Sequence, residues 1–454
     1  MKKSLLILFF TCWALFFAAF RPVMPFAAET AAFPDGTPVT GGRILMGTIG
    51  EPSNLIPYMA SDSASGEITG LLYVAPLKYD KDLNVVPWAA ASYEVLEGGR
   101  LLRFVLRDDI RWEDGVPLTA DDVEFTYKLM IDPKTPTAYS GDFLAIESFK
   151  KTGRLSFEVR YAKPFARSLM TWMGAILPKH VLEGQDIMTT PVARKPIGAG
   201  PYRLAKWDAG SMLTLTASDT YFEGRPNLDE VVYRIIPDPS TMFLELKAGK
   251  LDMMSLSPQQ YLRQTQGPQW ERDWRKYRYL SFSYTFLGFN LEHPFFKNVR
   301  VRRAISMAID RQSLIDGVLL GQGVPTVGPY KPGTWAYNDK LTPVRQDVDE
   351  ARRLLDEAGW KKNKDGLLER DGKPFLFTIL VNQGNDSRIK AAIIIQSQLK
   401  ALGITVHIRT VEWAAFIKEF VNKGHFDAII LAWTITLDPD IYDVWHSSRA
   451  KPGG

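Results

Sequence analysis

The last third of the chain alternates short apolar runs, typical of strands, with longer amphipathic stretches, typical of helices. The pattern predicts, in order, a strand at Phe375 to Val381, a helix at Arg388 to Leu402, a strand at Ile404 to Val411, a helix from about Ala414 to Asn422 and a strand at Phe426 to Trp433. Strands that alternate with helices of this length need crossover connections, which predicts a largely parallel α/β sheet. Ligands gather at the carboxyl ends of strands in such sheets, so the predicted site segments are Asn382 to Asp386 and Thr434 to Asp440.

A helix start signal precedes an amphipathic stretch in the first third of the chain. Within Pro117 to Met130, Thr119 is the predicted N-cap, and Asp121 and Asp122 follow in the first turn. Negative charge is favourable there because it meets the positive end of the helix dipole. Both aspartates are therefore interpreted as structural and not as catalytic acids.

The segment from Leu287 to Arg311 predicts a strand, a turn and a helix. Apolar residues fall at helical spacing on one face of the helix, at Val301, Ala304, Ile305, Ala308 and Ile309. Arginines crowd its first turn, at Arg300, Arg302 and Arg303, where the helix dipole disfavours cations. These arginines are expected to have carboxylate partners or to lie in water.

The amino terminus carries a pattern of its own. Met1 to Lys3 is charged and Ser4 to Phe20 is apolar, which predicts a secretory signal peptide over residues 1–28 and export across an inner membrane into the periplasm. An uncleaved anchor is the alternative, because the apolar run approaches the roughly 18 residues that span a bilayer. The single cysteine, Cys12, lies inside this segment, so cleavage after it leaves no thiol. A lipoprotein processing site ending at Cys12 is a further alternative.

Charge and motif content narrow the function. The chain has 454 residues and a net charge of +4, too slight an excess to indicate nucleic acid as a partner. It contains no Gly-x-Ser-x-Gly, His-Glu-x-x-His or Gly-x-x-x-x-Gly-Lys motif, and its five histidines lack metal-ligand spacing. We therefore expect neither an enzyme nor a cofactor or metal.

Five segments in order resemble the family 5 extracellular solute-binding proteins, the oligopeptide and dipeptide receptors of bacterial ABC importers. They are Glu51 to Pro57, Leu106 to Val123, Ile197 to Tyr202, Leu287 to Arg311 and Leu354 to Trp360. The resemblance covers the chain from about Gly41 to its end. Because several segments must match in register, the resemblance is far more specific than any one of them.

The resemblance implies an α/β, two-lobed type II periplasmic-binding-protein fold with an extra subdomain in the first lobe. Lobe I would comprise residues 41–70 and 195–278, the subdomain residues 71–194, and lobe II residues 279–454. A strand at Phe282 to Asn290 would carry the chain across the hinge. The implied protein is a monomer that encloses a ligand between its lobes and presents it to an inner-membrane ABC permease.

The sequence departs from the family pattern at its end. It stops at Gly454, just beyond the third predicted strand, where the family usually continues back to the first lobe. We therefore expect an incomplete lobe II, a single interlobe connection, and apolar surface exposed around Phe426 to Trp433. A fragment and a truncated gene product both remain open.

The resemblance also implies ligand contacts, each with a structural alternative. Ser61, Asp62 and Ser63 match the loop that pairs with the ligand main chain, although such a loop can simply be solvated. Trp413 and Trp433 match two tryptophans that face the cleft, and either can instead belong to a lobe core. Tyr139 is a weaker aromatic candidate. The full predicted set adds Asn382, Thr434, Thr436 and Asp438 from the segments that follow strands.

One family contact is altered. Thr436 occupies the position of the aspartate that binds a peptide amino terminus, and the run from Trp433 to Asp440 is one residue shorter than the pattern. Either Asp438 or Asp440 makes this contact through a shifted loop, or the protein does not bind the free amino terminus of a peptide. Peptide remains the first choice of cargo. The alternative cargoes are a blocked peptide, a sugar and a metal chelate. A binding protein that serves a sensor instead of an importer is the alternative function.

Overall fold

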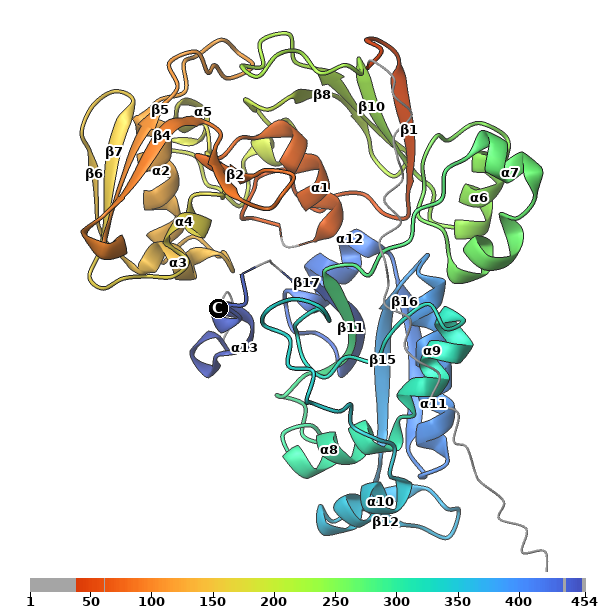
Figure 1. The fold of residues 1–454 in the computed structure, drawn as a ribbon. Helices are drawn as coiled ribbons and strands as arrows, with labels where there is room; N and C mark the ends of the chain where they lie inside the picture. Colours follow the sequence, from red (N-terminus) through yellow and green to blue (C-terminus); the bar gives the residue numbers. More distant parts are fainter. Residues whose placement is uncertain (1–37, 61, 436–437, 451–454) are drawn as a thin grey trace, which may run out of the picture.

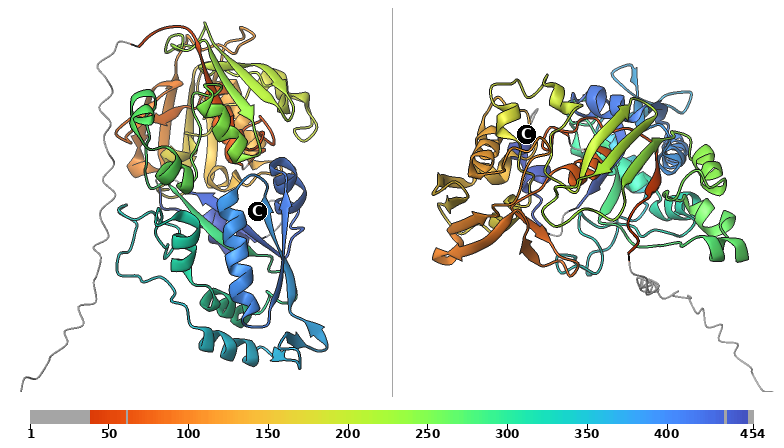
Figure 2. Two further views of the ribbon diagram at one scale, coloured as in Figure 1. Left: turned by 90° about the vertical axis from the view of Figure 1, so that its right-hand side faces the viewer. Right: turned by 90° about the horizontal axis from the view of Figure 1, so that it is seen from above.

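The computed structural model describes residues 38–60, 62–435 and 438–450 and has two lobes (Figures 1 and 2). Residues 43–273 form the upper lobe in Figure 1, here called the first lobe, and residues 283–434 form the second lobe below it. Each lobe buries its own apolar clusters. Within the described residues, no helix combines the length and the apolar character that crossing a bilayer requires.

The first lobe contains a mixed four-stranded sheet in the order β1-β10-β9-β8. Its strands are β1 (Arg43–Thr48), β8 (Tyr202–Asp208), β9 (Met212–Ala217) and β10 (Glu230–Ile235). β1 runs parallel to β10, and the remaining pairs are antiparallel. Every second residue of β9 is buried, as expected for a strand with one face against a core. Helix α1 (Ser63–Leu72) packs beside β8.

A second, antiparallel sheet lies in the predicted subdomain, in the order β4-β5-β7-β6. Its strands are β4 (Ala90–Leu96), β5 (Leu101–Leu106), β6 (Ile146–Lys151) and β7 (Ser156–Tyr161), next to the hairpin of β2 (Leu77–Tyr79) and β3 (Val85–Pro87). Short helical elements surround it: η1 (Glu97–Gly99), α2 (Ala120–Ile131), α3 (Ser140–Leu144), α4 (Ser168–Thr171), α5 (Lys179–Leu182) and η2 (Pro191–Ala193). One continuous core joins this region to the first sheet. The division at residues 71–194 stays a prediction.

Helix α2 has the predicted start. Thr119 is its N-cap, and the Asp122 carboxylate accepts a hydrogen bond from the Thr119 N–H at 2.8 Å, which completes a capping box. The same carboxylate accepts from the Lys179 N–H at 3.0 Å. Burial raises the pKa of Asp122 above its ordinary value, although these two N–H groups act against the rise. The predicted N-cap Thr119, with Asp122 in the first turn, is thereby confirmed.

Glu113, just before this helix, gives the first lobe a predicted pH dependence. Burial raises the pKa of its carboxyl group from 4.5 to about 7, against the opposing charge of Arg203. Between these two pH values the folded protein binds more protons than the unfolded chain, so stability falls as the pH rises through this window. After discounting for partial exposure, the expected loss is on the order of 1 to 2 kcal/mol.

Glu113→Gln is therefore expected to unfold at the same urea concentration at pH 5 and pH 8, after subtraction of the changes common to all variants. The wild type should lose stability over that interval relative to the variant. Glu147→Gln, at an exposed position, is the control and should follow the wild type. Parallel pH profiles for the wild type and Glu113→Gln would contradict the assignment.

Three short helical elements flank the outer side of β1, at the right in Figure 1. They are α6 (Pro239–Lys247), the π-helical turn η3 (Gln260–Gln264) and α7 (Pro268–Asp273). The Phe243 and Trp270 rings stack with centroids 5.7 Å apart, and Ile49 packs against the same cluster. This cluster therefore supports the end of β1 that faces the second lobe.

The second lobe contains the predicted, largely parallel sheet, in the order β11-β17-β15-β16. Its strands are β11 (Ser283–Phe289), β15 (Leu376–Asn382), β16 (Thr405–Val411) and β17 (Ala428–Thr434), with helix α11 (Asp386–Lys400) between β15 and β16. β15 is parallel to both β16 and β17, and only the edge strand β11 is antiparallel. The helix predicted after β16 is α12 (Trp413–Ala415), which continues into the π-helical turn η4 (Phe416–Val421).

The remaining elements form the lower part of the second lobe (Figure 1). They are α8 (Val299–Ala308), α9 (Arg311–Leu319), α10 (Val348–Glu357), β12 (Lys361–Lys362), β13 (Leu368–Arg370) and β14 (Lys373–Pro374). The predicted apolar face of α8 is buried. Its arginines differ: Arg300 lies 3.7 Å from Glu357, whereas Arg302 donates to the carbonyls of Phe296 and Lys297. Backbone carbonyls are thus a third kind of partner, in addition to carboxylates and water.

The expected exposure of the last strand is wrong for its first half. Ile429 is buried because η4 supplies Phe416 and Ile417 over one face of β17, and Ala428 and Ile430 are buried in the main apolar cluster of the second lobe. Exposure begins later, with Trp433 at 40%. Beyond β17 follow α13 (Tyr442–Trp445) and η5 (Ser447–Arg449), which lie below α3 of the first lobe in Figure 1.

Candidate functional site

The ends of three strands meet where the two lobes touch. β1 of the first lobe leads into Ile49 and Gly50, and Gly50 packs against Trp413, which follows β16 of the second lobe. Gly384, which follows β15, packs against Ile49 and the carbonyl of Pro237. We call these five residues the interlobe seam. It lies at the carboxyl edge of the parallel strands, the edge where α/β sheets hold ligands.

Asp62 and Trp413, both predicted site residues, are brought together across the seam. The Asp62 carboxylate caps α1: it accepts from the Ser65 N–H at 2.9 Å and from the hydroxyls of Ser65 and Ser53 at 2.7 and 2.5 Å. The indole Nε1–H of Trp413 donates to it at 3.4 Å. A buried carboxylate with these partners is a fixed anchor for the loop. Ser63 is the exposed first residue of α1, and Ser61 lies outside the described residues.

Tyr139, which directly precedes α3 in the first lobe, joins this group. Its hydroxyl donates to the Ala60 carbonyl at 3.4 Å, and its ring meets Tyr58 edge-on with centroids 6.0 Å apart. Burial raises the pKa of Tyr139, and the nearby Asp62 charge raises it further. The predicted residues Asp62, Tyr139 and Trp413 therefore gather around one loop, which begins at Tyr58.

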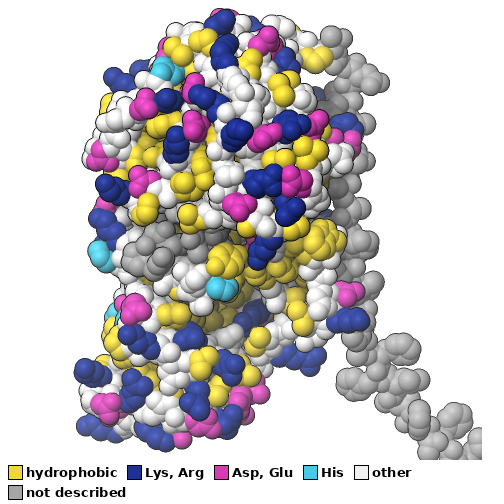
Figure 3. Space-filling view, turned by 90° about the vertical axis from the view of Figure 1, so that its left-hand side faces the viewer, with side chains coloured by type: hydrophobic (Ala, Val, Ile, Leu, Met, Phe, Trp, Pro, Cys, Tyr) yellow, Lys and Arg dark blue, Asp and Glu magenta, His cyan; other side chains and the backbone are white. Residues whose placement is uncertain are grey.

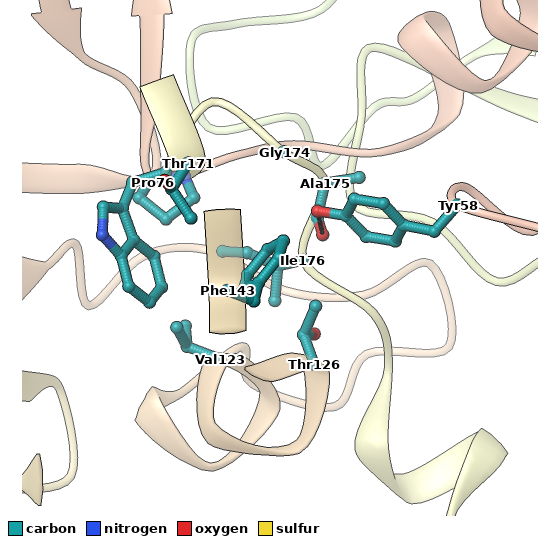
Figure 4. A pocket seen from close by; sticks show the side chains of 10 residues that line it. Tyr58, Pro76, Val123, Thr126, Phe143, Thr171, Gly174, Ala175 and Ile176 are labelled. Carbon is teal, nitrogen blue, oxygen red and sulfur yellow. Dashed lines mark hydrogen bonds between the residues drawn. The ribbon is translucent and has the colours of Figure 1, made fainter. Parts of the chain in front are cut away.

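Tyr58 also closes a small cavity inside the first lobe, shown in Figure 4. Its hydroxyl points toward Ala175 and donates to that carbonyl at 2.9 Å. The walls are mostly apolar, with Phe143 and Ile176 among them, and the space holds about one water molecule. The cavity is too small to enclose a peptide.

Asn382 ends β15 and is buried. Its side-chain oxygen accepts from the Arg388 guanidinium at 2.7 Å, and its amide donates to the Gln383 carbonyl at 3.3 Å. Arg388 is half-buried in the first turn of α11, and this burial lowers the pKa of its guanidinium to about 10. Among the described residues, no carboxylate forms an ion pair with it. The sequence prediction included Asn382 but missed Arg388.

Trp433 and Thr434 lie at the exposed end of β17. The Trp433 ring stacks on Phe286 of the neighbouring strand, with centroids 6.3 Å apart and an angle of 15° between the planes. Thr434 pairs with Ser283, and Thr436 lies outside the described residues. Figure 3 shows a hollow between the two lobes with hydrophobic side chains around it. An exposed aromatic plane on a rigid strand is suited to contact a ligand.

Asp438 meets a first-lobe arginine that the sequence did not indicate. Arg167 donates to both oxygens of Asp142, at 2.8 and 3.1 Å, and lies 3.6 Å from Asp438 and from Asp440. Burial would lower the pKa of Arg167, but the three carboxylates raise it overall. This guanidinium ties the segment after β17 to α3 of the first lobe. Within the described part of the chain, no cluster of side chains could hold a metal ion.

Comparisons with known proteins show which family has this architecture. The sequence model of the bacterial extracellular solute-binding proteins, family 5 middle, matches residues 84–453. The oligopeptide-binding protein AppA of Bacillus subtilis is 34% identical over 92% of this chain and 78% of its own. Protein XP55 of Streptomyces lividans is 31% identical over 94% and 77%.

Solved structures agree with the sequence comparisons. AppA from Bacillus subtilis in complex with a nonapeptide superposes with a TM-score of 0.85 at 34% identity, covering 92% of this chain and 84% of that one. NikZ from Campylobacter jejuni in complex with Ni(L-His) gives 0.77 at 26% identity, covering 90% and 80%. The two-lobed type II fold is thereby confirmed. The chain belongs to family 5 of the bacterial extracellular solute-binding proteins.

Proposed function

We propose that this chain captures peptides between its lobes and delivers them to the permease of an ABC importer. The observation that carries the proposal is the likeness to nonapeptide-bound AppA over 92% of the chain. The mechanism is binding without chemistry: a ligand that contacts both lobes stabilises the closed form. The permease then recognises the closed form.

The site residues suggest how a peptide would be held. Arg388 is a half-buried cation whose partner is an amide oxygen, so a ligand carboxylate would gain a charge-assisted hydrogen bond there. Trp433 and Tyr139 offer aromatic surface with little rotamer entropy to lose. Asp438 and Asp440 are near Arg167, which would compete with a ligand ammonium group for them. This arrangement favours ligands that do not depend on a free amino terminus.

The cellular setting completes the proposal. Residues 1–28 would act as the signal peptide, and the mature protein would work as a monomer in the periplasm. Membership of the solute-binding family is consistent with a receptor that releases its cargo unchanged. Neither a cofactor nor nucleic acid is needed for this role.

Native mass spectrometry of protein purified gently from a bacterial periplasm tests the proposal. Co-purifying species of mixed mass that fragment as peptides are the expected result. One discrete mass that is not a peptide would overturn the peptide assignment and indicate a dedicated carrier of a sugar or a metal chelate. Titration with a synthetic nonapeptide then gives the affinity of the emptied protein.

Trp433→Ala is expected to weaken nonapeptide binding by about 1 to 3 kcal/mol, because it removes the aromatic surface from the end of β17. Isothermal titration calorimetry measures the change. Trp335→Ala is a matched control, since that ring is 82% exposed on the loop between α9 and α10. Unchanged affinity in a folded Trp433→Ala protein would remove this residue from the site.

A further inference from the structure

We propose that Gly50 and Gly384 are closure residues: because neither has a side chain, the lobes approach closely enough to seat Trp413 against Asp62. The inference concerns how closure is set, and so it goes beyond the ligand class. It assigns a role to two residues that need not touch the ligand.

Gly50 has no room for a side chain on the side of the second lobe. A Cβ atom placed on it would lie 2.7 Å from Cβ, 3.0 Å from Cγ and 3.1 Å from Cδ1 of Trp413. Trp413 cannot withdraw easily, because the atom nearest to the added methyl group is its own Cβ, which no rotamer change moves, and because Glu412 caps its helix. The Gly50 carbonyl is itself held by the Thr48 hydroxyl at 3.1 Å. The low-energy response to a methyl group is therefore separation of the lobes.

Gly384 makes the corresponding approach from the second lobe. Its φ of +79° is a conformation that favours glycine, and an added Cβ would lie 2.3 Å from the Pro237 carbonyl oxygen. The next neighbour would be Cβ of Ile49 at 3.3 Å. A backbone oxygen at that distance cannot be avoided by a rotamer change. An alanine at position 384 would therefore also push the two lobes apart.

Both glycines affect the same movement, the separation of the two lobes. Ile49, which faces Gly384, directly precedes Gly50, which faces Trp413, so one separation relieves both contacts. The hydrogen bond from Trp413 to Asp62 is already 3.4 Å long, so a small further separation breaks it. A methyl group at either position should therefore lower the closed population in the absence of any ligand.

Interlobe distances measured by electron–electron double resonance test this inference. Nitroxide labels at Lys81→Cys and Lys364→Cys, both at exposed positions, report on the two lobes in a Cys12→Ser background. Samples are measured alone and with the nonapeptide. The wild type should populate a short distance, and Gly50→Ala and Gly384→Ala should each lower that population about tenfold.

Matched controls isolate the contact. Gly66→Ala lies in α1 with open space around it, and Gly424→Ala has a φ of +65° with nothing within 4 Å, which reproduces the backbone cost of Gly384→Ala alone. Both should retain the short distance. Trp413→Gly in the Gly50→Ala background should restore the short distance, because removal of the Trp413 side chain leaves room for the methyl group at position 50. Thermal unfolding confirms that each variant is folded.

The outcomes separate this inference from the peptide proposal. A wild type that closes but binds no nonapeptide leaves the closure residues intact and counts against the peptide ligand. A Gly50→Ala protein with the short-distance population of the wild type overturns the closure role. A wild type without a short distance under either condition overturns it as well.

Discussion

Trp360→Ala is expected to destabilise the second lobe by about 3 to 5 kcal/mol, the range for removing a large buried aromatic side chain. Trp360 is 1% exposed and stacks on Phe375 with centroids 4.3 Å apart. Phe295 meets it edge-on at 4.8 Å, and the Arg370 guanidinium lies 4.8 Å from its ring centre. Alanine would leave a cavity among Phe295, Phe375 and Arg370. Urea unfolding followed by far-ultraviolet circular dichroism measures the loss.

Two variants bracket this prediction. Trp360→Phe keeps the stacking surface and removes an indole N–H that has no partner among the described residues, so it should cost less than half as much as alanine. Trp335→Ala removes a ring that is 82% exposed and should stay within about 0.5 kcal/mol of the wild type. A loss below about 1 kcal/mol for Trp360→Ala would mean that this ring does not anchor the lobe.

The second lobe was the most predictable part of the fold because its signals are local. β15, β16 and α11 begin and end within two residues of the predicted positions, since alternation and helical spacing can be recognised without knowing any partner. The burial of β17 could not be predicted in that way. On one face it depends on η4, whose Phe416 packs in one cluster with Ile429, and periodicity does not show which element covers which face.

In the candidate site, too, only the features with a local sequence signal could be predicted. The rule about strand ends indicated the segment that contains Gly384 and nearly reaches Arg388. The capping role of Asp62 could have been predicted from its own residue type, because aspartate is a preferred N-cap directly before a helix. Arg167 had no such signal, because its carboxylate partners come from α3, 25 residues earlier in the sequence, and from beyond β17.

Gly198 holds the first sheet against the end of α1 by close backbone contact. A Cβ atom on Gly198 would lie 2.0 Å from the carbonyl oxygen of Leu72, the last residue of that helix. The same carbonyl accepts a hydrogen bond from the Gly200 N–H at 2.8 Å, and the Gly198 carbonyl accepts from the Glu113 N–H at 2.9 Å. A side chain there must push the two segments apart and break at least one of these bonds.

Gly198→Ala is therefore expected to destabilise the first lobe by about 2 to 4 kcal/mol, from overpacking together with a lost buried hydrogen bond. Urea unfolding at pH 8 measures it, where Glu113 is mostly ionised in both the folded and the unfolded protein and its titration contributes little. Gly70→Ala is the control: it lies in α1 near the same end, with nothing within 4 Å, and should be neutral or stabilising by up to about 1 kcal/mol. Equal stability of the two variants would contradict the contact, because the backbone conformation at Gly198 allows alanine and only the lack of space at Leu72 opposes it.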